Sequence, residues 1–176
     1  MLTTLPTWAE MIETWQYRYC FVKTQPGETL AQSAGRATPL RREGQPLLSQ
    51  AVWSVTWDLQ WVRRFNGRCA LRAVHTAFQG TITLPQIMPT ATSDPAQTDH
   101  FVNILRQRER QQLVVGRDAA AEIDRRLRHL PVSPSCDRLT RTANELGQRV
   151  LDRARAASPA QEARYRSIAA VTAIRE

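Results

Sequence analysis

Along the first half of the chain, apolar and polar residues alternate with a period of two, which is typical of β-strands. The clearest such run covers residues 51–64. Its large apolar face consists of Trp53, Val55, Trp57, Leu59 and Trp61. An earlier strand is expected over residues 17–24, where Tyr17, Tyr19 and Phe21 share one face because alternate residues of a strand point the same way.

Two more strands are expected after residue 64. Phe65-Asn66-Gly67 is a hairpin turn signal, since Asn and Gly readily adopt positive φ. The returning strand is placed at 69–78, and a third strand at 81–85 ends at a proline. The pattern puts two pairs on opposite faces of the returning strand, Leu71 and Ala73 against Arg72 and Val74. A short helix is expected at 28–33, and the Gly- and Pro-containing segments 34–50 and 86–99 are expected to be loops.

From His100 onward the apolar period becomes helical. A long helix is expected over 100–129, a break with two prolines over 130–135, a second helix over 137–156, and a third beginning at Ser158-Pro159. The inward positions of the first two helices are Leu105, Leu113, Gly116, Ala120, Ile123, Leu127, Leu139, Ala143, Leu146, Val150 and Leu151. Strands first and helices after predict an α+β fold, with an N-terminal antiparallel sheet followed by a helical C-terminal half.

The first sixteen residues are expected to be an amphipathic extension, and residues 17–176 a single α+β domain. Residues 6–16 have a helical pattern that places Trp8, Met11, Ile12 and Trp15 on one face. That stripe either packs on its own domain or contacts a partner or a membrane surface. No apolar window is long enough to span a membrane, and residues 1–16 do not read as a signal peptide.

The net charge is +8, and all basic residues except Lys23 are arginines. They are spread through the helical half, without zinc-finger spacing, a Gly-rich phosphate loop or an aromatic-basic repeat, so specific nucleic-acid binding is not predicted. The three cysteines Cys20, Cys69 and Cys136 include no C-x-x-C pair. They allow either one disulfide with one remaining thiol, or three reduced thiols.

Arg108-Glu109-Arg110-Gln111-Gln112 lies early in the long predicted helix. Taken alone, it is typical of a solvated helix face with local ion pairs. No second carboxylate close to Glu109 and no G-x-S-x-G serine completes a hydrolytic site. His100 and His129 would stand roughly 43 Å apart on a continuous helix, so they cannot share a metal ion, and His75 lies on a predicted strand.

An ordered set of residues carries a resemblance to a known family. It consists of Trp53-x-Val55-x-Trp57, Gly67-x-Cys69, the strand at 81–85, a long helix, Cys136, Ala143-Asn144-x-x-Gly147, Val150-Leu151 and Tyr165. This order resembles the bacterial domain-of-unknown-function 922 family, described as predicted secreted zinc-dependent proteases, over roughly residues 17–176.

The resemblance implies a zincin-like fold and a H-E-x-x-H motif, in which two histidines one helical turn apart bind zinc and the glutamate activates a zinc-bound water. In this chain the motif falls on Arg108, Glu109 and Gln112, and a third metal histidine of the family falls on Val171. All three histidines are therefore replaced. The resemblance thus implies a vestigial site, with no catalytic residues, no metal and no cofactor. It also implies a Cys69–Cys136 disulfide with Cys20 free, and hence a periplasmic or secreted location; a cytoplasmic location stays open.

These observations favour a pseudo-peptidase that binds a protein or peptide partner in the bacterial envelope. One alternative is a divergent hydrolase whose site has moved, using His75, His100 or Glu109. Another is a basic module that binds a polyanion through the arginines of the helical half. Those arginines are Arg106, Arg108, Arg110, Arg117, Arg125, Arg126 and Arg128.

Overall fold

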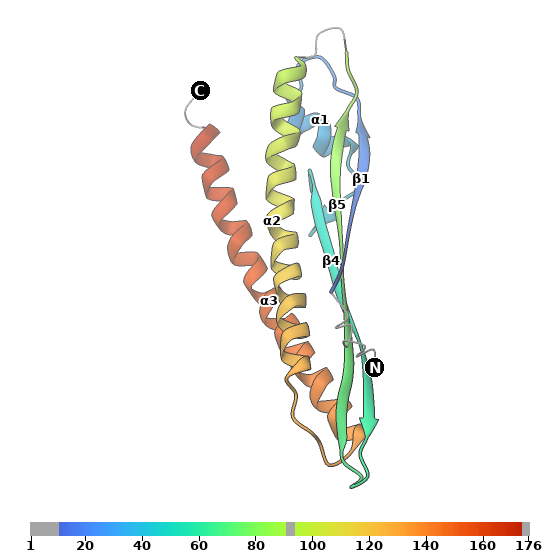
Figure 1. The fold of residues 1–176 in the computed structure, drawn as a ribbon. Helices are drawn as coiled ribbons and strands as arrows, with labels where there is room; N and C mark the ends of the chain where they lie inside the picture. The colour runs from blue at the N-terminus through green and yellow to red at the C-terminus, as the bar shows by residue number, and fades with distance from the viewer. Residues whose placement is uncertain (1–10, 91–93, 174–176) are drawn as a thin grey trace. The chain divides into compact units, whose positions relative to one another are not determined.

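The computed structural model describes residues 11–90 and 94–173, with the backbone alone described for 158–173 (Figure 1). Its elements are β1 (Ile12–Val22), α1 (Leu30–Ala37), β2 (Arg41–Arg42), β3 (Gln45–Pro46), β4 (Gln50–Arg63), β5 (Cys69–Ile87), α2 (Pro95–Arg128) and α3 (Cys136–Ala173). The larger sheet has the order β1-β5-β4, and β2 pairs with β3. The predicted α+β class, with an N-terminal sheet followed by helices, is confirmed.

The chain forms two compact units, and four elements contribute residues to both. Unit 1 consists of Met1–Thr14, Ser54–Gln79 and Val115–Glu176, and unit 2 of Trp15–Trp53 and Gly80–Val114. Strands β1, β4 and β5 and helix α2 each have one part in unit 1 and the other in unit 2.

In unit 2, β1 and the second part of β5 run in the same direction and end together (Figure 1). The Met88 amide donates to the Val22 carbonyl over 2.8 Å. Helix α1 begins with a capping box, in which Thr29 and Gln32 each accept the other's backbone N–H.

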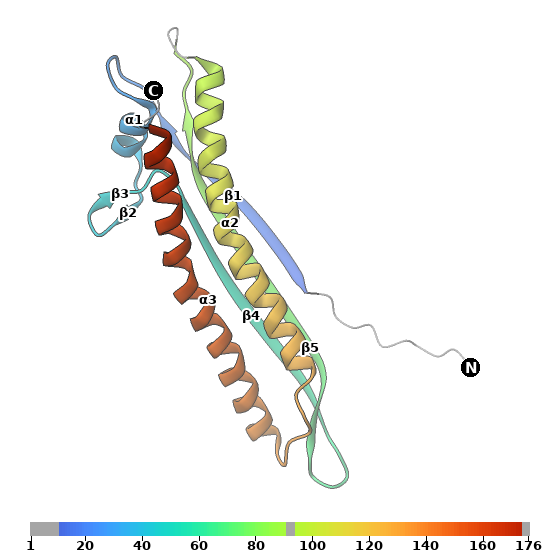
Figure 2. The ribbon, with the colours of Figure 1, turned by 90° about the vertical axis from the view of Figure 1, so that its left-hand side faces the viewer.

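Next to α1 lies the β2–β3 hairpin (Figure 2). Its turn residues Glu43 and Gly44 have φ of 52° and 80°, the left-handed pair of a type I′ turn. The segment 34–50, expected to be a loop, therefore contains the end of α1, this hairpin and the start of β4.

In unit 1, β4 and β5 form the predicted antiparallel hairpin. Gly67 has φ of 75°, and the Arg64 amide donates to the Arg68 carbonyl over 2.8 Å. Cys69 then pairs with Ser133 through two backbone hydrogen bonds of 2.8 Å, just before α3 begins.

Most of the predicted core is buried. The predicted inward positions of α2 and α3 are buried, except for the half-buried Leu146. On β5 the buried side chains include Val74, Thr76, Phe78, Ile82 and Leu84. Val74 thus belongs to the buried face, while Leu71 and Ala73, on the opposite face of the strand, are half-buried.

Three predicted boundaries are wrong. Residues 12–16 belong to β1 rather than to a helix, and residues 1–10, with Trp8, lie outside the described part of the chain. Residues 69–78 and 81–85 form the single strand β5, because even-numbered residues stay buried through Gly80. Helix α3 continues through Ser158-Pro159, since proline removes one helical hydrogen bond yet keeps a helical φ.

Candidate functional site

The Glu109 carboxylate is buried in unit 2 and bound by two side chains. Only 4% of Glu109 is exposed. Its Oε1 accepts a hydrogen bond from Ser49 Oγ at 2.7 Å, and Arg108 donates to the same oxygen through Nε at 2.9 Å and Nη2 at 2.7 Å. Arg108 Nη2 also donates to Ser49 Oγ at 2.9 Å, which closes a triangle of three side chains. The negative charge of Glu109 is thus compensated inside the protein.

Sequence reasoning missed Ser49, which lies just before β4 and is 2% exposed. No local pattern indicates it, because 60 positions separate it from Glu109. The segment of irregular backbone that leads into β4 brings the hydroxyl to α2.

Gln112 lies one helical turn after Arg108 and is also buried, with 6% exposure. Positions i and i+4 share a helix face, so α2 places Arg108 and Gln112 on one face. The resemblance assigns two zinc-binding histidines to these two positions. The side chains present there do not fit zinc. Arg108 has no lone pair and its guanidinium is bound to Glu109, while Gln112 offers a neutral amide, a poor substitute for imidazole.

Val171 lies in α3 within unit 1, and its side chain is outside the described part of the chain. Among described residues, no group of three or more His, Cys, Asp or Glu side chains is placed to hold a metal ion. His75 on β5 and His100 on α2 are exposed. His129 follows the end of α2, with its Nδ1 2.7 Å from the Arg125 carbonyl oxygen.

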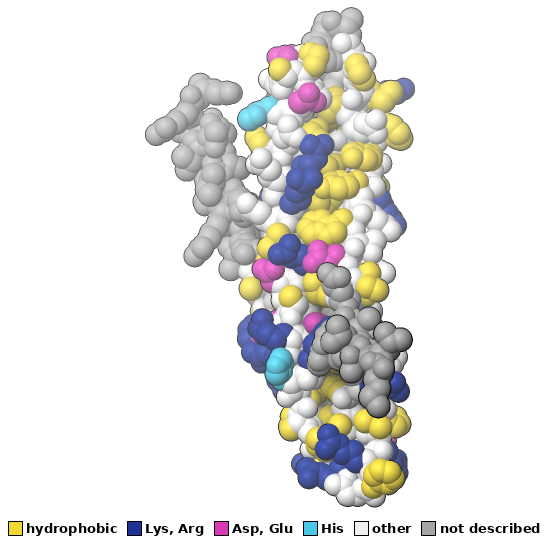
Figure 3. All heavy atoms as spheres, viewed as in Figure 1, with side chains coloured by type: hydrophobic (Ala, Val, Ile, Leu, Met, Phe, Trp, Pro, Cys, Tyr) yellow, Lys and Arg dark blue, Asp and Glu magenta, His cyan; other side chains and the backbone are white. Residues whose placement is uncertain are grey.

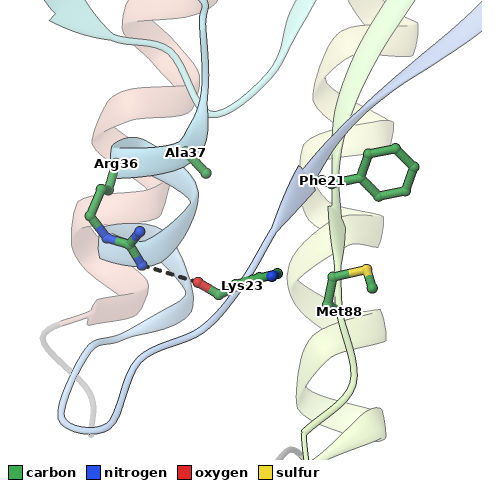
Figure 4. A pocket seen from close by; sticks show the side chains of 5 residues that line it. All are labelled: Phe21, Lys23, Arg36, Ala37 and Met88. Atoms are coloured by element: carbon green, nitrogen blue, oxygen red, sulfur yellow. Dashed lines mark hydrogen bonds between the residues drawn. The ribbon is translucent and has the colours of Figure 1, made fainter.

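A shallow cavity of about 430 Å³ lies elsewhere in unit 2, lined by Phe21, Lys23, Arg36, Ala37 and Met88 (Figure 4). Arg36 donates to the Lys23 carbonyl at 3.0 Å and is ion-paired with Glu28 at 2.9 Å. Hydrogen bonds from Arg36 and then Ser33 lower the pKa of Glu28, and the Glu28 partner raises the pKa of Arg36. The cavity is therefore lined by three apolar side chains and by two cationic residues, Lys23 just after β1 and Arg36 on α1.

Several of the residues that carry the family resemblance meet within unit 1. Trp57 Nε1 donates to Asn144 Oδ1 at 3.0 Å, and a Cβ added to Gly147 would lie 2.5 Å from the Trp57 ring. Cys69 and Cys136 form a disulfide, while Cys20 is a free thiol. The motif residues thus join β4 and β5 to α3: a small residue accommodates the indole ring, and a covalent bond ties the sheet to the start of the helix.

These features define an α+β protein with a disulfide between sheet and helix and an internally neutralised glutamate on its long helix. The chain belongs to the DUF922 family, described as "Bacterial protein of unknown function", which it matches over residues 17–166. No curated protein and no solved structure matches it significantly. Within the described residues, no helix is long and apolar enough to cross a membrane.

Proposed function

We propose that the protein is a catalytically inactive, peptidase-like member of its family, a pseudo-peptidase that acts by binding a protein or peptide partner in the bacterial envelope. The observation that carries this proposal is the triangle of Arg108, Ser49 and Glu109. A general base must be free to take a proton from water or substrate. The Oε1 atom of Glu109 instead accepts hydrogen bonds from the Arg108 guanidinium and the Ser49 hydroxyl.

The disulfide supports the envelope as the location. Disulfides persist in oxidising compartments such as the periplasm and are rare in the cytosol. The Cys69–Cys136 bond joins residues 67 positions apart, at the junction of β5 and α3.

A relocated hydrolytic site is less well supported. The Ser49 hydroxyl hydrogen-bonded to the Glu109 carboxylate is the type of pair that could activate a nucleophile. However, Ser49 is 2% exposed, so a substrate carbonyl has no access to its oxygen.

Binding of a polyanion by the helical arginines is also less well supported, because several of them are already paired with carboxylates. The pairs are Arg108–Glu109, Arg117–Asp118, Arg126–Glu122 and Arg128–Asp124. Because carboxylates already neutralise these guanidinium groups, fewer of them can neutralise phosphates and displace the counterions bound there.

Metal content tests the proposal. Tag-free protein purified without chelators is analysed by mass spectrometry and assayed on quenched peptide libraries. We expect less than about 0.1 zinc per chain, where a resident zinc site would give one, and no cleavage. The Cys20→Ser variant controls for zinc held by the free thiol. Stoichiometric zinc that is lost in Glu109→Ala, or chelator-sensitive cleavage, would contradict the proposal.

A further inference from the structure

Strand β1 is an edge strand with an exposed aromatic row. In the order β1-β5-β4 it has a neighbouring strand on one side only, as far as the described residues show. Trp15, Tyr17, Tyr19 and Phe21 alternate along it and so share one face. Tyr19 is 50% and Phe21 69% exposed. An edge strand presents N–H and C=O groups on which another extended chain can pair.

Cations border this row at two points. Arg110 of α2 donates from Nε to the Tyr17 hydroxyl at 3.0 Å. Lys23 lies just after β1 in the cavity that Phe21 also lines, so the cavity continues the aromatic row (Figure 4). Neither Arg110 nor Lys23 has a carboxylate within ion-pair distance among the described residues. Figure 3 shows hydrophobic side chains gathered beside Lys and Arg side chains over this side of α2 and β1.

We propose that the edge of β1 binds an extended acidic segment of a partner polypeptide. The segment pairs its backbone with β1, lays apolar side chains on the aromatic row, and places carboxylates near Arg110 and Lys23. This inference rests on the binding role proposed above and names its site and the chemistry of its partner. From Tyr17 to Lys23, strand β1 covers about 20 Å. The two acidic residues of the partner segment that reach Arg110 and Lys23 therefore stand about six positions apart.

A polypeptide fits this surface better than a nucleic acid. Aromatic side chains next to arginines also stack on single-stranded bases. A free strand edge, however, offers a row of main-chain donors and acceptors that only another peptide backbone matches in spacing, as in strand-addition complexes. Unit 2 also contains the carboxylates of Glu28 and Glu43 on the segment after β1, which disfavour a continuous polyphosphate track.

The test uses the full chain and a capped peptide of alternating Thr and Val with two glutamates about six positions apart. One control peptide has glutamine for glutamate, and another is N-methylated at every residue, so that neither of its edges can donate main-chain hydrogen bonds to β1. Calorimetry measures affinity, and amide hydrogen exchange reports protection of β1. We expect binding of the acidic peptide, loss of at least about tenfold with either control, and slower exchange in β1.

Variants of the protein locate the site. Lys23→Glu, Arg110→Glu and Tyr19→Ala should each weaken binding about tenfold, as expected for a charge or an aromatic contact at an interface. Trp61→Ala is the matched control, because Trp61 is a similarly exposed aromatic, 47%, on the other edge strand β4, and it should bind as the parent does. The Lys23→Glu variant should fold normally, because Arg36 binds the backbone carbonyl of Lys23 and not its side chain.

Equal binding of the glutamine peptide or the N-methylated peptide, or no binding by the acidic one, would overturn the inference. So would salt-sensitive binding of oligothymidylate that Tyr19→Ala abolishes while the peptide fails to compete. None of these results alters the metal content or the peptidase assay, so failure here is distinguishable from failure of the proposed function.

Discussion

At the residue scale, Arg108 occupies the position where the family resemblance expects a metal-binding histidine. It provides positive charge beside Glu109 without providing a ligand. A buried carboxylate is costly unless it is paired and hydrogen-bonded. The Arg108 guanidinium and the Ser49 hydroxyl therefore stabilise the buried Glu109 carboxylate in the folded protein. A zinc ion bound at this place would instead activate water for hydrolysis.

Removing this guanidinium should destabilise the protein. Arg108→Met leaves the buried Glu109 with the Ser49 hydroxyl as its remaining described hydrogen-bond donor. Because 36% of the Arg108 side chain is exposed, water screens part of the loss, and we expect a cost of about 1–3 kcal/mol in urea denaturation. Arg117→Met, which breaks the exposed pair with Asp118, should cost less than about 0.5 kcal/mol. Equal effects of the two substitutions would show that Glu109 does not depend on Arg108.

The Trp57 ring should make Gly147 sensitive to a single added methyl group. A Cβ there would lie 2.5 Å from Trp57 Cζ2, so the ring must shift and strain its hydrogen bond to Asn144. We expect Gly147→Ala to cost about 1–3 kcal/mol, as overpacking does. In the control Gly35→Ala the nearest atom is 3.7 Å away, and the helix should be unchanged or slightly more stable. Thermal unfolding of both variants measures this, and equal midpoints would contradict the packing argument.

At the element scale, α1 is held by its capping box and by Arg36, which pairs with Glu28 just before the helix. Hydrogen bonds from Arg36 and then Ser33 lower the pKa of Glu28 below its ordinary value of 4.5. A carboxyl with a lowered folded-state pKa stabilises the fold above the ordinary pKa, and this stabilisation disappears as the pH falls through the lowered one.

The Glu28→Gln variant should therefore be less stable than the parent protein near neutral pH, and the difference should shrink as the pH falls below 4.5. Arg36→Met should show the same convergence, because it removes the largest cause of the shift. Glu145→Gln, at an exposed position of α3, provides a control. Denaturant midpoints measured from pH 7 downward check this, and a gap independent of pH would contradict it.

At the scale of the whole molecule, the Cys69–Cys136 bond links β5 to the start of α3 across 67 residues of sequence. It restricts the unfolded chain and anchors a small apolar cluster containing Leu139. Cys69→Ser/Cys136→Ser should lose about 2–4 kcal/mol of stability. Cys20→Ser, which removes the free thiol, should lose much less. Chemical denaturation with and without a reductant measures both, and insensitivity of the parent protein to the reductant would count against a structural role of the disulfide.

The elements with a strong period were predictable from the chain. The alternation at 51–64 and the helical period of Leu113, Ile123 and Leu127 correspond to β4 and α2. Each pattern is local, since residues two apart on a strand or three to four apart on a helix share a face whatever the rest of the chain does. The sequence also contains the signal that β5 is continuous, because Phe78, Gly80 and Ile82 are two positions apart and so lie on the same face of one strand.

Local pattern failed where two structures fit the same residues. Ile12 and Trp15 suit a helical stripe, yet residues 12–16 extend β1, because pairing with another strand overrides helix propensity. Pro159 suggested a new helix, although proline does not oblige a helix to end.

The sequence by itself determined the order of strands and helices and the charge, and it led to the hypothesis that Arg108 and Gln112 stand where the family resemblance predicts metal histidines. Only the tertiary structure decided that Ser49 reaches Glu109 from 60 positions away and that Trp57 rests on Gly147. Contacts between residues so far apart depend on how whole elements pack, and no local spacing encodes them.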